Sequence, residues 1–180
     1  MKTNQRILMV LGFISSMLYR FIPFRPPNVE PLMSVMMPFS KKVSKIELFA
    51  FAFLSIFIYD YFTAGIGTYT ITAGVCYGIL GIWSSSYFAK RKFSLKNYVL
   101  CSSIGIIFFD LATGVILGPL IGGTSFYIAL FGQIPFTALH LMGGALFALT
   151  VSPIIERVIA KSEVNVFQLG KKLQEVRVRV

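Results

Sequence analysis

Three acidic side chains stand where a charge is costly. Glu30, Asp60 and Asp110 lie beside or inside stretches rich in Phe, Ile, Leu and Gly, in a chain that has only seven acidic residues. Ionisable groups within apolar membrane segments cost on the order of 2.5–3.5 kcal/mol even on lenient scales, and they usually face a partner or a cavity. These carboxylates are therefore the first candidates for a binding site.

Two interpretations of these carboxylates remain open. The first is a structural ion-pair network in which Arg20 pairs with Asp60 or Asp110, because Arg20 and Arg25 are the only cations predicted on their side of the membrane. The second is a polar outer cavity with Asp110 at its floor. Its predicted substrate-binding residues are Arg25, Asn28, Glu30, Asp60, Asp110 and His140. Asn28 and Glu30 can also cap a helix N-terminus, and a single histidine is more often a hydrogen-bonded core residue than a ligand.

The sequence holds no motif for a chemical reaction. Nucleophilic catalysis needs a Ser or Cys beside a base, but His140 is the single histidine and no GxSxG turn surrounds a serine. HExxH, GxGD and Walker A sequences do not occur. Cys76 and Cys101 form no CxxC pair. We therefore expect no enzyme activity, cofactor or metal, with Asp60 and Asp110 on facing helices as the remaining two-carboxylate alternative.

Six apolar stretches must position these residues: 7–24, 31–44, 46–62, 70–89, 98–117 and 135–159. A helical span needs about 17–25 mostly apolar residues, and the second stretch is short and contains Pro38. Charged residues make up 13% of the chain, against about 25% in soluble domains. Strands of alternating polarity are absent from the sequence. The predicted fold class is an all-α membrane protein, a compact bundle of six transmembrane helices.

The basic residues predict the orientation of this bundle. Of 17 Lys and Arg, all but Arg20 and Arg25 precede the first stretch, lie in or next to every second connection, or lie near or beyond the end of the sixth stretch. Cytoplasmic loops accumulate these residues, so both termini are expected in the cytoplasm, in a multi-pass protein of the cell (plasma) membrane. Residues 1–161 would form the transmembrane domain and 162–180 a short basic cytoplasmic tail. This distribution also accounts for the net charge of +10 without nucleic-acid binding.

The remaining connections are candidates for covering a ligand. They are loop one (23–30), loop three (63–69) and loop five (118–134), and the last two are rich in glycine. Loop five exceeds ordinary connection lengths, which favours a lid. A leading signal peptide is disfavoured, because its removal would leave five spans and reverse the sidedness of the basic loops.

Three short motifs and the architecture resemble one known family. The motifs are RPPNVEP at 25–31, DYFTAGIG at 60–67 and PFTALH at 135–140. Together with six short helices and Gly-rich outer loops, they resemble the substrate-binding S component of energy-coupling factor (ECF) transporters over residues 7–159. The resemblance implies that loops one, three and five close over a vitamin or similar micronutrient. It also implies a transmembrane coupling subunit and two cytoplasmic ATPases as partners.

Small residues on the first helix would contact the coupling subunit in that family. Gly12 and Ser16 have the matching spacing, although this helix contains no alanine. Small residues four apart let helices approach closely. The sequence therefore predicts a substrate-capture subunit in the lipid bilayer. The alternative is a structural or morphogenetic multi-pass membrane protein that binds protein partners.

Overall fold

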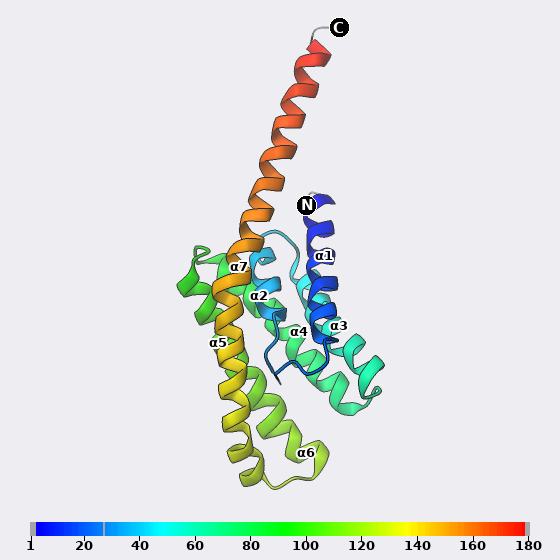
Figure 1. Ribbon diagram of the computed structural model, residues 1–180, viewed down its shortest axis with the longest axis vertical. Helices are drawn as coiled ribbons and strands as arrows, with labels where there is room; N and C mark the ends of the chain where they lie inside the picture. The colour runs from blue at the N-terminus through cyan, green and yellow to red at the C-terminus, as the bar shows by residue number, and fades with distance from the viewer. Residues whose placement is uncertain (1–2, 27, 179–180) are drawn as a thin grey trace.

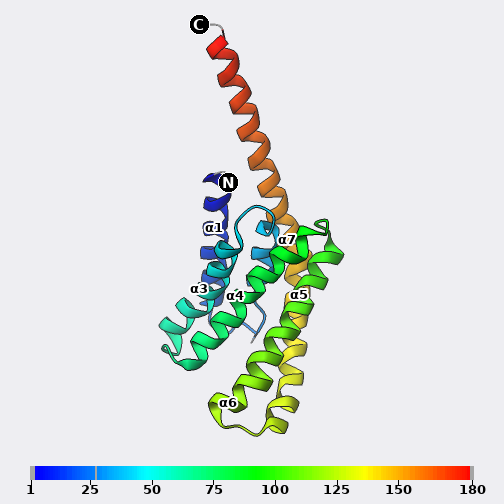
Figure 2. The ribbon, with the colours of Figure 1, turned by 180° about the vertical axis from the view of Figure 1, so that it is seen from behind.

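Helices make up all of the regular structure that is described. The computed structural model describes residues 3–26 and 28–178, with side chains for 4–26 and 28–163. No strand occurs within these ranges, so the predicted all-α class is confirmed (Figures 1 and 2). Three helical stretches are long and apolar enough to cross a membrane, namely Lys45–Thr63, Leu95–Gly122 and Phe126–Glu163.

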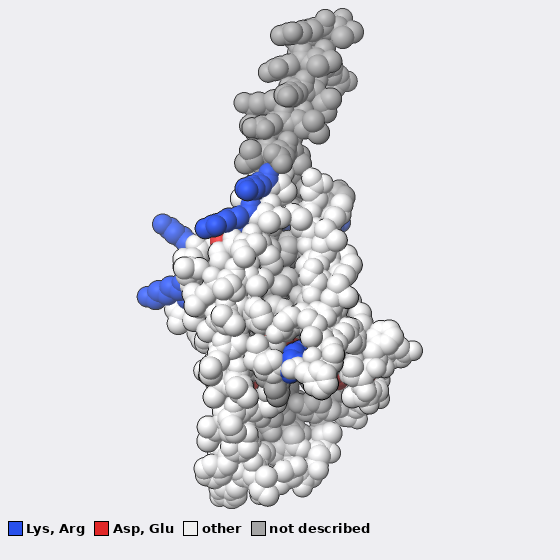
Figure 3. All heavy atoms as spheres, viewed as in Figure 1, with Lys and Arg blue, Asp and Glu red and all other residues white. Residues whose placement is uncertain are grey.

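The chain reverses direction between successive long helices, apart from the first two, which run in the same direction (Figures 1 and 2). The long elements are α1 (Thr3–Arg20), α3 (Lys45–Thr63), α4 (Thr68–Ala89), α5 (Leu95–Asp110) and α7 (Phe126–Val178). One end of the bundle holds the start of α1 and the connection that precedes α3. Two ion pairs lie at this end, Arg6 with Glu47 at 2.7 Å and Lys42 with Glu163 at 2.7 Å. We call this the basic end. Figure 3 shows Lys and Arg gathered toward it, above a mostly uncharged surface.

The second apolar stretch forms a much shorter helix than predicted. Within 31–44, only α2 (Leu32–Met36) and the 3₁₀ helix η1 (Met37–Phe39) are helical, and every residue of both is buried. Five and three residues are fewer than the roughly 17 needed for a span. Pro38 sits in the first turn of η1, where its missing N–H does no harm. The segment is a buried plug that the longer helices surround.

Glycines bring α4 against α3. A Cβ at Gly78 would lie 2.5 Å from the Phe49 ring, and one at Gly74 would lie 3.0 Å from Phe53. At Gly81 the nearest atom is the backbone carbonyl oxygen of Leu48. Absent side chains thus let the two backbones approach, which confirms the close packing that the small-residue spacing predicted.

Loop five is not the irregular loop that the sequence predicted, and its role as a lid stays a prediction. Most of 118–134 is helical, since α6 spans Gly118–Gly122 and α7 begins at Phe126. Pro119 lies in the first turn of α6, where proline is tolerated, and Gly123 ends it with φ of 68°. Pro135, predicted to open the sixth helix, lies inside α7. Prolines and glycines that suggested a loop therefore mark a helix start, a helix cap and a position within a helix.

The backbone of α7 continues past the predicted domain boundary. It is helical to Val178, so residues after 162 extend the last helix, and residues 179–180 lie outside the described part (Figure 1).

Candidate functional site

A polar cavity lies at the end of the bundle opposite the basic end. It has a volume of about 240 Å³ and is lined by side chains from the end of α1, loop one, α3, α4, α5 and α7. Its lining includes five of the six predicted substrate-binding residues, which are Arg25, Asn28, Glu30, Asp60 and His140. The sixth, Asp110, is buried directly behind His140. The structure thus brings all six predicted residues together.

Arg20 holds loop one against α3. Its Nη1 donates a 2.6 Å hydrogen bond to the Ser55 carbonyl oxygen, and its guanidinium lies 4.1 Å from the centre of the Tyr59 ring. Its Nε is 3.1 Å from Glu30 Oε2, an ion pair without hydrogen-bond alignment, since that Nε has no hydrogen-bond acceptor. The two side chains are only 8% and 11% exposed. The buried pair therefore joins α1, loop one and α3 at the wall of the cavity, and we call it the frame of the cavity.

The predicted pairing of Arg20 with Asp60 or Asp110 is wrong. Arg20 pairs with Glu30, because the chain turns back after α1 and places loop one beside the end of that helix. An ion-pair network does exist, as one interpretation proposed, but with this different partner.

Asp110 and His140 form the second buried pair. Asp110 Oδ1 lies 2.9 Å from His140 Nδ1, and the residues are 1% and 5% exposed. The carboxylate thus holds one ring nitrogen, and the histidine ring that lines the cavity offers its other nitrogen, Nε2. Asp110 Oδ2 is buried without a hydrogen-bond partner among the described residues, which leaves an acceptor available beside the site.

Irregular backbone surrounds these side chains. The π-helix η2 (Leu111–Leu117) begins directly after Asp110, and π-helical turns occur frequently at functional sites. In loop one, Asn28 has φ of 61°, a conformation in which asparagine is enriched, and Phe24 has the same φ. Such a value in a bulky residue costs on the order of 1–3 kcal/mol, and strain of this kind clusters at binding sites.

Sequence reasoning missed the aromatic side chains of the cavity. Tyr59, Tyr69, Phe109 and Phe136 line it, and none of them was among the predicted substrate-binding residues. A signal was present, because Phe136 and His140 are four residues apart and so share a helix face. Phe136 and Phe109 both contact the His140 ring edge to face, with centroids 6.4 and 6.3 Å apart.

The predicted coupling residues lie inside the bundle. A Cβ at Gly12 would be 2.8 Å from Val35 of α2, and Ser16 is 1% exposed with its hydroxyl donating to the Gly12 carbonyl oxygen. Their small size is thus explained by α2. The outward face of α1 instead carries apolar side chains, each at least 47% exposed: Ile7, Val10, Leu11, Ile14 and Leu18. The coupling role of Gly12 and Ser16 stays a prediction.

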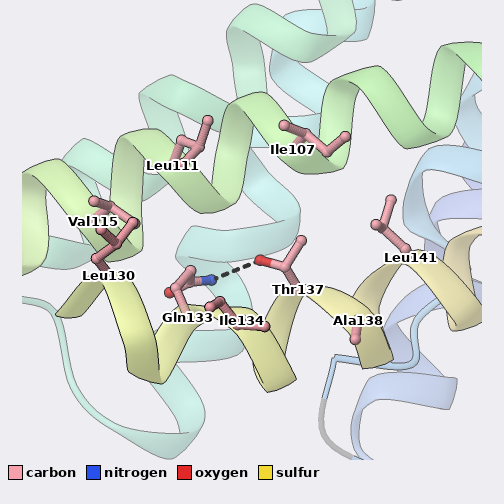
Figure 4. Close-up of a pocket in the computed structure, with 9 residues that line it drawn as sticks. All are labelled: Ile107, Leu111, Val115, Leu130, Gln133, Ile134, Thr137, Ala138 and Leu141. Carbon is pink, nitrogen blue, oxygen red and sulfur yellow. Dashed lines mark hydrogen bonds between the residues drawn. The ribbon is translucent and has the colours of Figure 1, made fainter. Parts of the chain in front are cut away.

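A second cavity of about 310 Å³ lies between α5–η2 and α7 (Figure 4). Its walls are almost wholly apolar, and a 3.3 Å hydrogen bond from Gln133 to Thr137 satisfies the polar groups of both side chains in part. A cavity with no charged side chain and almost wholly apolar walls suits hydrocarbon. The smaller polar cavity is therefore the candidate site for a soluble ligand.

No known protein family, curated protein or solved structure matches this chain.

Proposed function

We propose that this chain is the membrane-embedded substrate-capture subunit of an ECF-type importer for a vitamin or similar micronutrient. The observation that supports the proposal is the polar cavity of about 240 Å³, which residues from five helices and loop one line together. Concave sites with a few convergent polar groups between helices are where small molecules bind. The Arg20–Glu30 ion pair and the Asp110–His140 hydrogen bond are both buried beside this cavity, an arrangement that a scaffold protein does not require.

In this proposal the chain crosses the cell membrane six times, with its basic end in the cytoplasm. The cavity then opens to the outside, in agreement with the exclusion of Lys and Arg from that side other than Arg20 and Arg25. Ligand binds from outside under loops one and three, and the hairpin of α6 and α7 takes the place of the predicted loop-five lid.

The proposed subunit performs no chemistry. Binding would be followed by reorientation when a transmembrane coupling subunit responds to ATP hydrolysis by two cytoplasmic ATPases. The exposed apolar face of α1 offers the coupling subunit a surface, as an alternative to Gly12 and Ser16. Lipid or a partner helix must shield these exposed apolar side chains from water.

Native mass spectrometry of protein extracted in mild detergent tests this function. We expect an added mass of one small molecule, and a higher melting temperature for the loaded protein than for the stripped protein, since a ligand that binds only the folded state stabilises it. Asp60→Asn should reduce the fraction of protein that retains the small molecule, whereas the control Lys92→Gln, at the basic end, should not. Protein that never retains a small molecule and copurifies with other membrane proteins instead would refute capture and favour the structural alternative.

A further inference from the structure

The charges that line the cavity are not all paired. Four ionised side chains line it, and Arg20 and Glu30 neutralise each other. Arg25 and Asp60 remain without a charged partner among the described residues. In the described part of the chain neither takes part in an ion pair, and the Asp60 carboxylate accepts no hydrogen bond from the protein. The cavity thus presents one cation and one anion that do not meet.

Arg25 and Asp60 are anchored on different elements, loop one and α3. Arg25 is held by its Nε, which donates a 3.0 Å hydrogen bond to the Arg20 carbonyl oxygen, and its guanidinium lies 5.7 Å from the Tyr59 ring centre. Asp60 is fixed near the end of α3, where its carbonyl oxygen accepts from the N–H groups of Ala64 and Gly65 at 2.9 and 2.7 Å. Arg25 therefore keeps its outer nitrogens for another acceptor, and Asp60 keeps both carboxylate oxygens.

We propose that the ligand of this cavity is a small zwitterion, whose cationic group pairs with Asp60 and whose anionic group pairs with Arg25. The inference rests on the capture function proposed above and names its substrate class. A ligand with one charge would pair with one residue and be repelled by the other, and a neutral ligand would desolvate both without compensation. A dipolar ligand satisfies both residues, and charge-assisted hydrogen bonds are the stronger ones.

The rest of the lining indicates the size of this ligand and the chemistry of the part between its two charges. Tyr69, Phe109 and Phe136 supply aromatic surface between the polar groups. A volume of about 240 Å³ lies below the roughly 300–1,000 Å³ of sites for drug-sized ligands. A zwitterion with a single ring fits both features, and His140 Nε2 adds one polar contact.

Two matched sets of probes test the proposal by isothermal titration calorimetry on the full-length protein in nanodiscs. The first set is L-phenylalanine, L-phenylalaninamide and N-acetyl-L-phenylalanine. The second is 4-(aminomethyl)benzoate, 4-(aminomethyl)benzamide and 4-methylbenzoate. Each set holds a zwitterion, a cation and an anion of similar size, and the sets differ in the distance between the charges. We expect a zwitterion to bind at least tenfold more tightly than the two single-charge analogues of its set.

Two substitutions assign the charges. Asp60→Asn should weaken the zwitterion at least tenfold and leave the anion's affinity unchanged or improved. Arg25→Gln should weaken the zwitterion likewise and spare the cation. Neither residue takes part in an ion pair within the described residues, so both variants should fold, and the control Lys92→Gln should bind as the wild type does.

The outcomes separate this inference from the capture function. A single-charge analogue that binds as tightly as the zwitterion overturns the inference. So does a retained compound, identified by its mass, that has one charge or none, and that result leaves capture intact. Protein that retains no compound and binds none of the six probes overturns both.

Discussion

The buried pair of Arg20 and Glu30 makes a quantitative prediction about the frame of the cavity. Glu30→Gln keeps the shape of the side chain but leaves the Arg20 charge without its anion. Both side chains are about nine-tenths buried, at 8% and 11% exposure. Removal of one partner from a buried pair costs about 3–5 kcal/mol. Because the hydrogen bond to Ser55 and the Tyr59 ring still stabilise the guanidinium, we expect about 3 kcal/mol.

An exposed ion pair in the same chain provides the matched control. Arg6 and Glu47 are closer, at 2.7 Å against 3.1 Å, but their side chains are 61% and 23% exposed. Exposed pairs contribute about 0–1 kcal/mol, so Arg6→Gln should change the free energy of unfolding by no more than that. Both variants can be compared by reversible unfolding with sodium dodecyl sulfate in mixed micelles, followed by circular dichroism.

A double variant isolates the charge from the loss of packing. Arg20→Met combined with Glu30→Gln removes both charges, and we expect it to regain most of the stability that Glu30→Gln alone loses. If Glu30→Gln costs no more than Arg6→Gln, then water reaches the pair and the assignment of a buried frame is incorrect.

Three further predictions concern packing and topology. Gly81→Ala should lower the free energy of unfolding, because the added Cβ would clash with the α3 backbone. Gly132→Ala has open space around it and should be neutral or stabilising by about 0.5–1 kcal/mol. Chemical denaturation of the two variants measures both free energies. Gly12→Leu should impair folding rather than only coupling, because α2 fills the space beside it, and retention of full stability with lost transport would contradict this. On a background without other cysteines, a cysteine at Lys92 should react with an impermeant maleimide only from the cytoplasm and one at Gly122 only from outside; labelling of both from one face would refute the six-span proposal.

The clustering of the site was predictable because it follows from the cost of burying charge. Glu30, Asp60 and Asp110 were singled out by their positions relative to apolar stretches, and such groups must share a polar environment. The pairing was not predictable. Whether Arg20 meets Glu30 or Asp110 depends on how loop one turns and how each helix is rotated, and no local pattern encodes either.

The predictions of helix limits failed at proline and glycine. The sequence of 118–134 looks like a loop because Pro119, Gly122 and Gly123 follow one another closely, yet the same residues start and cap α6. Pro135 was read as a helix start, but the residues before it are apolar and continue the helix that contains it. Propensity describes single positions, whereas tertiary packing decides whether a proline interrupts a helix or is accommodated in it.

The buried plug of α2 and η1 has a consequence for how the protein is made. Five residues of α-helix and three of 3₁₀ helix are together about 13 to 14 Å long, at about 1.5 and 2.0 Å per residue. This is too short for the insertion machinery to release alone into lipid. Its contacts come from both ends of the sequence, with Val35 against Gly12 and the Ser34 carbonyl oxygen accepting from Ser152 at 2.8 Å. The plug can thus be enclosed only after α7 has been synthesised. Loop one, which leads into the plug and holds Arg25 and Glu30, reaches its final position at that point, so the candidate site is completed in the last stage of biogenesis.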